Sequence, residues 1–367
     1  MKIVEVLFSL TPGGAERFVV DLSNELSKTD DVTLLTLKDD KTDVEQRNFY
    51  KFDLCDRVNY VNLGLPDGFS IKSQWILYRE IKNFNTDIVH INDKNLCKFM
   101  ILPLFFLSKK VKFFMTIHND LHNGYDSGFN KFVFNTLGRW KRIRFAALSQ
   151  KNYIDMNSYY PSSKFKCIVN GRAPMVPTEK FMQVKAEFEK YRKSANTKIM
   201  LHVARFNSQK NQQLLINAFN KLVLQGLDVQ LIILGTGFNS DEGRHLLSMA
   251  GDNVHYLGVR KNISDYMLNA DIFCLSSIYE GMPITLLEAS LAGVPCVSTP
   301  VCGSVDLILD RINGKLSKDF TLESYVDALQ YVVKHYLELK DNALDMRRNS
   351  PYSMSECAKK YKTYFTE

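Results

Sequence analysis

The chain has 367 residues, 45% of them hydrophobic and 24% charged, and its formal net charge is +7 at pH 7. This length suits two domains rather than one small core, and the composition excludes a largely disordered chain. The mild positive charge fits an anionic partner such as a nucleotide, a phospholipid surface or nucleic acid, without selecting one of them.

The seven cysteines are scattered along the chain and include no C-x-x-C pair. We therefore expect reduced, mostly buried thiols, and neither a disulfide framework nor a zinc site. The first residues lack the pattern of a signal peptide, and the longest apolar run, 99–107, is far shorter than the ~20 residues that span a bilayer. These features predict a cytoplasmic protein.

The N-terminal stretch predicts a strand, a glycine turn and a helix in succession. Residues 3–7 form the strand, Gly13 and Gly14 the turn, and Phe18 and Leu22 lie on the apolar face of the helix. Paired glycines allow a ligand to approach the backbone closely, but a plain tight turn has the same sequence signature.

Strands and helices continue to alternate through the first half of the chain. This order predicts a parallel, doubly wound sheet, in which ligands bind at the carboxyl ends of the strands. His90 and His118 both lie at such ends. A single histidine there is usually a structural hydrogen-bonding group, which is our interpretation of His90. Further strands are predicted at 32–37, 60–63, 88–91, 111–117 and 144–149.

The segment 129–145 is basic and aromatic, with five lysines and arginines and no acidic residue. Phe129, Val133, Leu137 and Trp140 recur at helical spacing. Two interpretations have equal support: a helix that lies on an anionic membrane surface, or a helix packed on the sheet with a solvated basic face.

The second half begins after a lysine-rich, proline-containing stretch from Met175 to about Thr197, which predicts a hinge region. A strand at 198–204 is followed by Arg205 and Lys210 in the spacing R-x4-K-N, just before a helix at 212–224. Two long cations beside a helix start are what a pyrophosphate clamp requires, although either one alone would be an ordinary surface cation.

Two further turns follow predicted strands. The strand at 229–234 ends in Gly235-Thr-Gly237, a weak signal because no third glycine follows at Rossmann spacing. We interpret it as a turn that gives a nucleotide room. A strand at 254–259 is followed directly by Arg260.

The most informative stretch is 276–300, between predicted strands at 271–276 and 294–299. Pro283 is preset for a first helical turn and Gly293 for the end of the helix. The stretch is therefore predicted to form a strand–helix–strand unit.

Two glutamates eight positions apart lie in this unit. Glu280 precedes the helix, and Glu288 lies in its second turn. The unpaired amides of roughly Met282 to Leu286 point out of the helix start, where an anion could bind. For an isolated pair with this spacing, solvated glutamates on an ordinary crossover would be the preferred explanation.

The full spacing from Glu280, E-G-x-P-x-x-x-L-E-A-x-x-x-G-x-P, closely resembles the E-x7-E signature of the retaining GT-B glycosyltransferases of the family 4, or group 1, type. The resemblance extends over nearly the whole chain and is strongest in its second half. One departure is N-G-R-A from Asn170, where the family usually has N-G-x-D. The resemblance implies two Rossmann-like, doubly wound α/β domains that face one another across a cleft. These would be an acceptor-binding domain at 1–174, with a C-terminal helix at 352–367 packed back on it, and a nucleotide-sugar-binding domain at 175–351.

The resemblance also implies roles for residues outside the signature. The G-G-A-E-R opening at Gly13 and Gly14 would face the donor phosphates, and the T-x-H at His118 would bring an imidazole to the donor sugar. The backbone near Val259 and Arg260 would recognise the edge of the base. The predicted catalytic residues are thus Glu280, His118, Arg205 and Lys210. The predicted donor-binding residues are Gly13, Gly14, Arg205, Lys210, Gly235, Val259, Arg260, Gly281, Met282, Pro283, Ile284, Thr285, Leu286 and Glu288.

The implied reaction is glycosyl transfer with retention of the anomeric configuration, with a UDP-sugar as the default donor. Neither a metal nor another cofactor is expected, since Arg205, Lys210 and the helix start supply the positive potential that a divalent cation would otherwise give to a leaving diphosphate. Glu288 would hold ribose hydroxyls. Glu280 would lie near the transferred sugar, where it holds hydroxyls or stabilises positive charge at the anomeric carbon.

The acceptor implied by the resemblance is a glycan or a lipid-linked acceptor in bacterial surface-polysaccharide synthesis, such as capsule or lipopolysaccharide. Two alternatives remain. A sugar-nucleotide epimerase shares the fold, but the combined signature fits transferases better. A non-catalytic nucleotide-sugar-binding regulator would keep the second half and lose groups such as His118. A nucleic-acid partner is not expected, because the basic residues form no extended stripe interleaved with aromatics.

Overall fold

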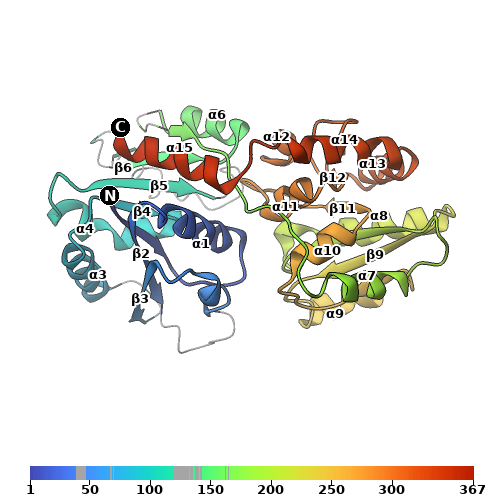
Figure 1. The fold of residues 1–367 in the computed structure, drawn as a ribbon, viewed down its shortest axis with the longest axis horizontal. Helices are drawn as coiled ribbons and strands as arrows, with labels where there is room; N and C mark the ends of the chain where they lie inside the picture. Colours follow the sequence, from blue (N-terminus) through green and yellow to red (C-terminus); the bar gives the residue numbers. More distant parts are fainter. Residues whose placement is uncertain are drawn as a thin grey trace. The chain divides into compact units, whose positions relative to one another are not determined.

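The computed structural model describes residues 1–38, 47–66, 68, 70–118, 132, 135–136, 140, 143–161, 163 and 165–367. The chain divides into two compact units, each an α/β layer structure (Figure 1). The first unit comprises Met1–Ala173 and Tyr352–Glu367, and the second comprises Pro174–Pro351.

The first unit is built on a seven-stranded, wholly parallel sheet in the order β3-β2-β1-β4-β5-β6-β7. Its inner strands are mostly buried apolar runs, as a sheet covered by helices on both faces requires, whereas the edge strand β3 is largely half-exposed. The predicted parallel, doubly wound sheet is confirmed. The strands are β1 Lys2–Leu7, β2 Asp31–Lys38, β3 Val58–Leu65, β4 Ile88–Ile91, β5 Lys112–Ile117, β6 Ile143–Ala147 and β7 Phe165–Cys167.

Alternate residues of one strand reach different helices of the first unit. Val89 and Ile91 of β4 join the core that includes Leu77 of α3, whereas His90 meets Tyr361 of α15. This alternation is the period-two pleat of a strand covered on both faces. The helical elements are α1 Gly14–Leu26, η1 Lys51–Asp53, α3 Ile71–Asn83, η2 Lys94–Phe99, α4 Ile101–Phe106, α6 Gln150–Tyr159 and α15 Met354–Thr366.

The C-terminal helix α15 packs within the first unit. Tyr364 donates its hydroxyl hydrogen to the carbonyl of Phe145 at 3.0 Å, and the Lys112 amine reaches the carbonyl of Thr366 at 3.1 Å. A Cβ added to Gly171 would lie 2.4 Å from the carbonyl oxygen of Ser353, so only glycine lets these segments approach so closely. The end of the chain is therefore part of the core of the first unit.

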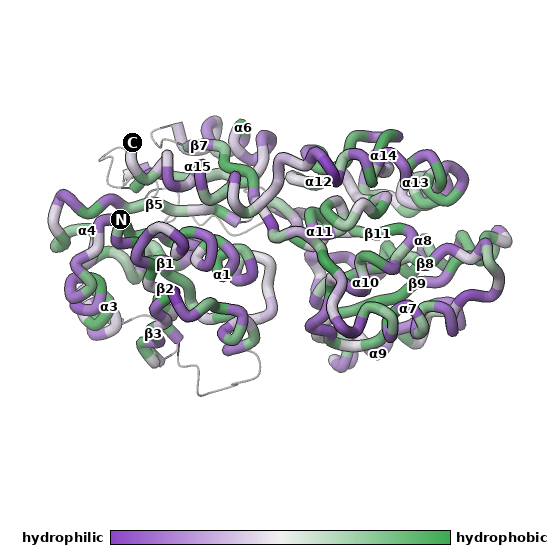
Figure 2. The backbone as a smooth tube through the Cα atoms, viewed as in Figure 1, coloured by the Kyte–Doolittle hydropathy of each residue, from purple (hydrophilic) through white to green (hydrophobic). Residues whose placement is uncertain are grey.

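The second unit carries a six-stranded parallel sheet in the order β10-β9-β8-β11-β12-β13. Hydrophobic residues concentrate on its strands, while the helices alternate in hydropathy (Figure 2). The strands are β8 Lys198–Val203, β9 Val229–Leu234, β10 Val254–Tyr256, β11 Ile272–Leu275, β12 Cys296–Ser298 and β13 Gly314–Leu316. The helical elements are α7 Phe181–Glu189, η3 Ser208–Lys210, α8 Gln212–Leu224, α9 Asp241–Ser248, α10 Ile263–Asn269, α11 Ile284–Ala292, α12 Ser304–Leu307, α13 Leu322–Lys334 and α14 Tyr336–Arg348.

The stretch predicted as a hinge, 175–197, is instead largely built into the second unit. Val184 and Phe188, four residues apart on one face of α7, are buried, and Phe188 meets the ring of Tyr266 with centroids 5.7 Å apart. The hinge prediction rested on the prolines and lysines of this stretch and did not take this apolar pair into account.

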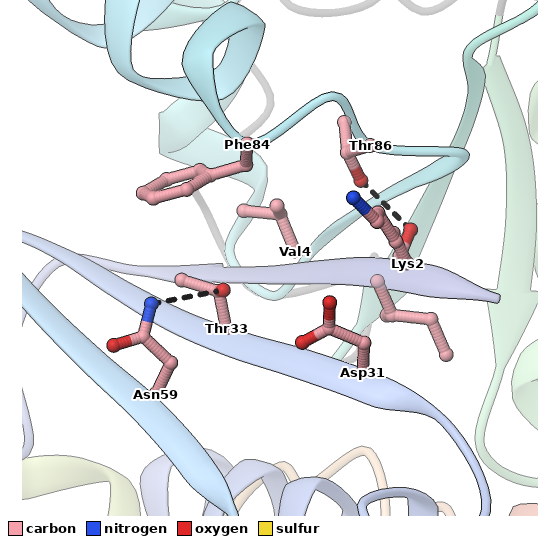
Figure 3. Close-up of a pocket in the computed structure, with 8 residues that line it drawn as sticks. Lys2, Val4, Asp31, Thr33, Asn59, Phe84 and Thr86 are labelled. Carbon is pink, nitrogen blue, oxygen red and sulfur yellow. Dashed lines mark hydrogen bonds between the residues drawn. The ribbon is translucent and has the colours of Figure 1, made fainter.

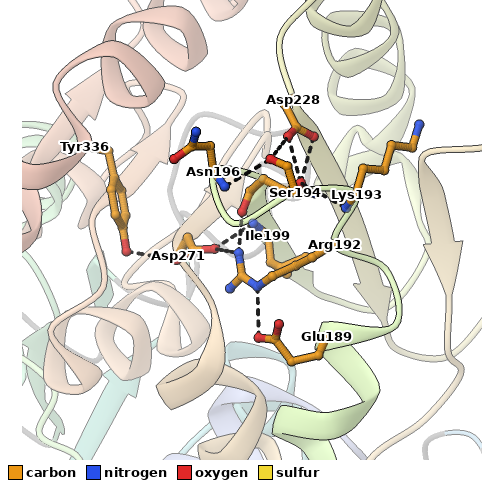
Figure 4. A network of polar contacts seen from close by, with 10 residues as sticks. Glu189, Arg192, Lys193, Ser194, Asn196, Ile199, Asp228, Asp271 and Tyr336 are labelled. Carbon is orange, nitrogen blue, oxygen red and sulfur yellow. Dashed lines mark hydrogen bonds and ion pairs between the residues drawn. The ribbon is translucent and has the colours of Figure 1, made fainter.

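Polar contacts also fix the segment between α7 and β8 (Figure 4). The carboxylate of Asp271 pairs with Arg192 at 2.9 Å, and it accepts hydrogen bonds from the Ile199 amide at 2.8 Å and the Tyr336 hydroxyl at 2.9 Å. Three elements are thus joined at the amino ends of β8 and β11. Asp228 holds the loop before β8 in the same way, by accepting hydrogen bonds from Ser194 and other residues of that loop.

One pocket of the first unit lies at the amino ends of its central strands (Figure 3). It has a volume of about 130 Å³ and is lined by Lys2, Asp31, Asn59, Thr86 and neighbouring side chains. Ligands of parallel sheets bind at the opposite, carboxyl edge. This pocket is therefore not a candidate for the donor site.

Two predictions concern membranes. Among the described residues, every helix is too short or too polar to cross a bilayer. The predicted basic helix 129–145 lies mostly outside the described residues, and its two interpretations stay open.

Candidate functional site

The signature stretch forms the predicted strand–helix–strand unit between β11 and β12. Helix α11 begins directly after Pro283, whose backbone is extended, and ends at Gly293 in the left-handed region with φ 69°. Glu280 lies on the loop before the helix, and Glu288 lies in its second turn. Local sequence chemistry decided these boundaries, which is why they were predictable.

Glu280 is held in one orientation at the carboxyl edge of the second sheet. Its side chain is only 8% exposed and forms an ion pair with Lys210. The Ser277 hydroxyl donates to the same carboxylate oxygen at 2.7 Å, and Gln209 approaches the other oxygen at 3.5 Å. These donors fix the nearly buried carboxylate in one position.

The loop that carries Glu280 is tied to the loop that follows β8. The Ile278 amide donates to the carbonyl of Gln209 at 2.8 Å, and the Ser276 hydroxyl donates to the carbonyl of Lys210 at 2.8 Å. Asn211 adopts the left-handed conformation, with φ 47°, directly before α8. These contacts bring R-x4-K-N and E-x7-E, which are about 70 residues apart in sequence, to one edge of the sheet.

The two cations of the predicted clamp differ in their surroundings. Arg205 is exposed at the end of β8, and its guanidinium has no ion-pair partner within the described part of the chain. Lys210 is already paired with Glu280. A phosphate that binds here would contact one exposed cation, Arg205, and a second cation, Lys210, that also pairs with a carboxylate. The sequence did not predict this arrangement.

The start of α11 has donors without backbone partners. For the amides of Ile284, Thr285 and Leu286, the described residues supply no hydrogen-bond acceptor. Such amides and the helix dipole favour an anion at this position. Glu288 lies one turn further on, with a side chain that is nearly buried.

Gly303 fixes the shape of the loop before α11. It adopts φ 74°, and a Cβ added to it would lie 2.8 Å from the carbonyl oxygen of Gly281 and from the Cα of Met282. A larger residue at this position would displace the loop Gly281–Pro283, and with it the helix start.

The glycines after β9 have a packing role that the sequence did not reveal. A Cβ added to Gly235 would lie 1.9 Å from the carbonyl oxygen of Ala204, and one added to Gly237 would crowd Phe206. The turn therefore lies against the loop that carries Arg205. Arg260 donates to the Tyr266 hydroxyl at 2.8 Å, so its side chain is held by α10, while the neighbouring Val259 is exposed.

Three predicted donor residues belong to the first unit. Gly13 and Gly14 lie at the start of α1, and His118 follows β5 directly. The His118 ring meets that of Phe18 in α1, with centroids 5.6 Å apart. His118 and the glycine turn are thus neighbours at the carboxyl edge of the first sheet.

A buried polar network lies beneath His118. Glu5 of β1 is fully buried, and one carboxylate oxygen lies 2.8 Å from Nδ1 of His90 and accepts a hydrogen bond from the Asn92 amide at 2.7 Å. On its other side, Nε2 of His90 lies 2.7 Å from the Thr116 hydroxyl. The Thr116 hydroxyl in turn meets that of Tyr361 at 2.9 Å. His90 is therefore a structural hydrogen-bonding residue, as interpreted.

This network determines which nitrogen of His118 carries the proton. The amide nitrogen of Asn92 donates to Glu5, which leaves the Asn92 carbonyl oxygen facing Nε2 of His118 at 3.5 Å. Burial, with a smaller contribution from nearby His90, lowers the pKa of His118 to about 3. The imidazole is therefore neutral near pH 7, with the hydrogen on Nε2 and an acceptor lone pair on Nδ1.

The low pKa of His118 predicts how stability varies with pH. The folded state keeps the imidazole neutral, whereas the unfolded chain binds a proton near pH 6.5, so stability falls as the pH drops below about 6.5. We expect at most about 1.4 kcal/mol lost per pH unit from this group, and less because the ring is partly exposed. Urea unfolding of wild type and His118→Gln at pH 7, 6 and 5 measures the effect. The variant should lose less stability on acidification, and equal losses in the two proteins would contradict the low pKa.

The sequence did not reveal the residues that orient the predicted groups. Glu5 and Asn92 support His118, and Ser277 and Gln209 support Glu280. Their only signal in the sequence is that they are polar residues near strand ends. The sequence does not show which of these residues contact one another across a sheet.

No group of three or more histidine, cysteine, aspartate or glutamate side chains that could hold a metal ion occurs among the residues that the structure describes.

Comparison with known proteins adds to this geometry. The family described as "Glycosyl transferases group 1" matches residues 183–350, and that described as "Glycosyltransferase Family 4" matches residues 12–171. A solved structure of Anabaena HepE in complex with UDP and glucose is similar over 100% of this chain and 99% of that one, with a TM-score of 0.79 and 18% identity. At that identity, the likeness concerns the fold.

Two curated relatives are similar in sequence over part of the chain. An uncharacterised glycosyltransferase of Methanocaldococcus jannaschii is 25% identical over 62% of this chain and 59% of its own length. An Escherichia coli galactosyltransferase, named for the transfer of galactose from UDP-Gal to a GlcNAc-diphosphoundecaprenol, is 34% identical over 20% of this chain and 19% of its own length. In the first three curated relatives, the matched stretch spans 31% to 59% of that protein.

Proposed function

Because this chain belongs to the glycosyltransferases of the group 1 and family 4 type, with the GT-B fold, we propose that it transfers a sugar from a UDP-sugar with retention of the anomeric configuration. The acceptor in this proposal is a glycan or a lipid-linked glycan of bacterial surface-polysaccharide synthesis. The support for the acceptor is the relatives, among them one named for a diphosphoundecaprenol substrate.

One observation carries the proposal: a fixed carboxylate, a shared lysine and open helix-start amides meet at the carboxyl edge of the second sheet. In our proposal, Arg205, Lys210 and the amides of Ile284–Leu286 bind the donor diphosphate and stabilise it as it leaves. Glu280 faces the transferred sugar.

The remaining donor contacts are proposed from the family resemblance together with the local geometry. Glu288 accepts hydrogen bonds from ribose hydroxyls, and the backbone near Gly235, Val259 and Arg260 lies along the base. His118 offers the lone pair of Nδ1 to a sugar hydroxyl. Gly13 and Gly14 allow the donor phosphates to approach the backbone.

We propose that the reaction needs no divalent metal. The cations and amides above supply positive charge where the diphosphate leaves, which is the role that a metal ion would otherwise have. The turnover rate is expected to change little when EDTA is added to the assay. A strict requirement for magnesium or manganese would contradict this assignment.

The two signature carboxylates are expected to have different kinetic roles. Glu288→Gln should mainly raise the KM for the donor, because the ribose contact is equally strong in the ground and transition states. Glu280→Gln should mainly lower kcat, because its charge matters most when the anomeric carbon becomes cationic. Steady-state kinetics on both variants measures this, and the opposite pattern would exchange the two roles.

The experiment that tests the function is a panel of nucleotide-sugars incubated with the protein, with and without short glycan acceptors. Release of UDP from one donor, and transfer to an acceptor with the donor's anomeric configuration by NMR, is the expected result. Conversion of a donor to its epimer, without release of the nucleotide, would favour the epimerase alternative. Donor binding without any turnover would favour the regulator.

We further propose that segment 129–145 contacts an anionic membrane surface, where a lipid-linked acceptor would be found. Its five cations and aromatic residues support this, and a location at the inner face of the plasma membrane follows from it.

A further inference from the structure

Large apolar side chains are exposed on one part of the first unit. Trp75 of α3 is 46% exposed, Phe105 and Phe106 of α4 are each 60% exposed, and Trp140 is 59% exposed. Ile71 and Ile101 are exposed beside them. We call these six residues the aromatic face. Single exposed apolar residues are ordinary, but a group of this kind on neighbouring elements calls for a binding partner.

Ring contacts join the members of the aromatic face. Trp75 stacks on Phe106 with centroids 6.0 Å apart, and Tyr78 meets both rings edge-on, at 5.5 and 6.3 Å. Phe105 meets Trp140 edge-on at 5.9 Å. The contacts make one surface from α3 to α4 and link α4 to Trp140.

The geometry of α3 keeps this face away from the core. Leu77 and Ile81 point inward and are fully buried. Ile71 and Trp75, four residues apart, are exposed on the outer side, and Tyr78 lies at the edge of that side, partly buried against the core.

Cations surround the aromatic face. Six exposed lysines and arginines lie on α3, η2 and the turn after α4, and none of them forms an ion pair with another described residue. None of the carboxylates on these elements pairs with the six: Asp87 accepts from the backbone amide of Lys2, Asp93 caps η2, and Glu80 of α3 forms no ion pair with another described residue. The six are Lys72, Arg79, Lys82, Lys98, Lys109 and Lys110.

This combination identifies the partner. Protein–protein interfaces are depleted in lysine, and a second copy of the chain would bring six uncompensated cations against six. Bilayer interfaces instead favour tryptophan and tyrosine rings at the level of the head groups, with lysine and arginine beside anionic lipids. We propose that the aromatic face and its six cations dock the first unit on an anionic phospholipid surface, with the Trp75 and Phe106 rings inserted among the head groups.

The chain contains a built-in reporter for this docking, because its only two tryptophans, Trp75 and Trp140, both lie in the aromatic face. Full-length protein is mixed with vesicles of phosphatidylglycerol and phosphatidylcholine at low salt. The tryptophan emission should shift to the blue and be quenched by lipids brominated near the head group. Vesicles of phosphatidylcholine alone, or high salt, should abolish both effects.

Variants test whether the aromatic face and its six cations are the surface that binds the vesicles. Lys72→Glu, Arg79→Glu and Lys82→Glu together, or Phe105→Ser with Phe106→Ser, should weaken vesicle binding at least tenfold in sedimentation assays. The matched control, Lys185→Glu, Lys190→Glu and Lys318→Glu, makes the same change of net charge with exposed lysines of the second unit and should bind like wild type. All these residues are exposed, and circular dichroism checks that each variant is folded.

Three results would overturn the proposal. Wild type could ignore anionic vesicles at low salt. The triple reversal on α3 could bind like the control. If binding were then lost only on reversal of Arg139, Lys141 and Arg142, the membrane contact would be assigned to segment 129–145. Ultracentrifugation could show that Phe105→Ser with Phe106→Ser converts a dimer to a monomer, which would make a second copy the partner. No sugar donor enters these assays, so their failure would leave the transferase proposal untouched.

Discussion

Replacement of Lys210 by alanine is expected to lower the turnover number by about two orders of magnitude or more, since a group that stabilises a leaving anion contributes on the order of 3–4 kcal/mol to the transition state. Arg205→Ala should have a similar effect. Lys221→Ala is the control: Lys221 of α8 forms an exposed ion pair with Glu323 of α13, and its loss should change turnover little. Steady-state kinetics on the three variants measures the effect.

The ion pair with Glu280 gives Lys210 a second possible role, as the residue that holds the carboxylate in place. A double-mutant cycle separates the two roles. If Lys210 binds the diphosphate, Lys210→Ala should still lower turnover when Glu280→Gln is already present. If it acts only through Glu280, the double variant should resemble Glu280→Gln alone. Near-normal turnover in Lys210→Ala and Arg205→Ala would remove both residues from the mechanism.

The largest expected loss of stability follows from Glu5→Ala. The variant leaves the buried Asn92 amide without its acceptor and removes the carboxylate beside Nδ1 of His90, and each buried polar group left unsatisfied costs about 1–3 kcal/mol in the free energy of unfolding. Glu5→Gln keeps the volume and one acceptor oxygen, so a smaller loss is expected. The control is Glu25→Ala, whose ion pair with Lys28 is at the surface. Urea unfolding compares the variants.

A loss of less than about 1 kcal/mol in Glu5→Ala would mean that water or a rearranged side chain replaces the carboxylate. The Asn92 amide would then be free to turn, and Nε2 of His118 would no longer need to carry the hydrogen. The tautomer of His118, observed by NMR of the imidazole nitrogens, would detect that change even in a stable variant.

The elements of the fold were predictable because their signals are local. The helix 212–224 and the strand 229–234 were predicted with the bounds of α8 and β9, since apolar periodicity and flanking turn residues determine them. The short strands β7 and β13 were missed, because three residues are too few to establish a period. The helix α7 was missed because its apolar face is narrow.

The candidate site was predictable in part for a similar reason. Each side chain of the signature lies near a turn that its own sequence specifies, so Glu280 and the helix start could be located along the chain. The partners across the sheet could not. Nothing near Glu5 indicates that it meets Asn92, 87 residues later, because that contact depends on the strand order β1-β4. The pairing of Lys210 with Glu280 depends likewise on the order β8-β11.

The position of α15 affects how the protein is made. The ribosome synthesises the strands of the first sheet early, but Tyr361 and Phe365, both fully buried against that sheet, are synthesised only after the whole second unit. Until they arrive, the face of β4 and β5 that carries His90 and Phe114 lacks its cover. Domains usually fold in the order of their synthesis. Here the second unit, although synthesised later, can complete its core before the first unit does. A nascent chain stalled near residue 350 would expose the uncovered face of the first sheet to chaperones and proteases.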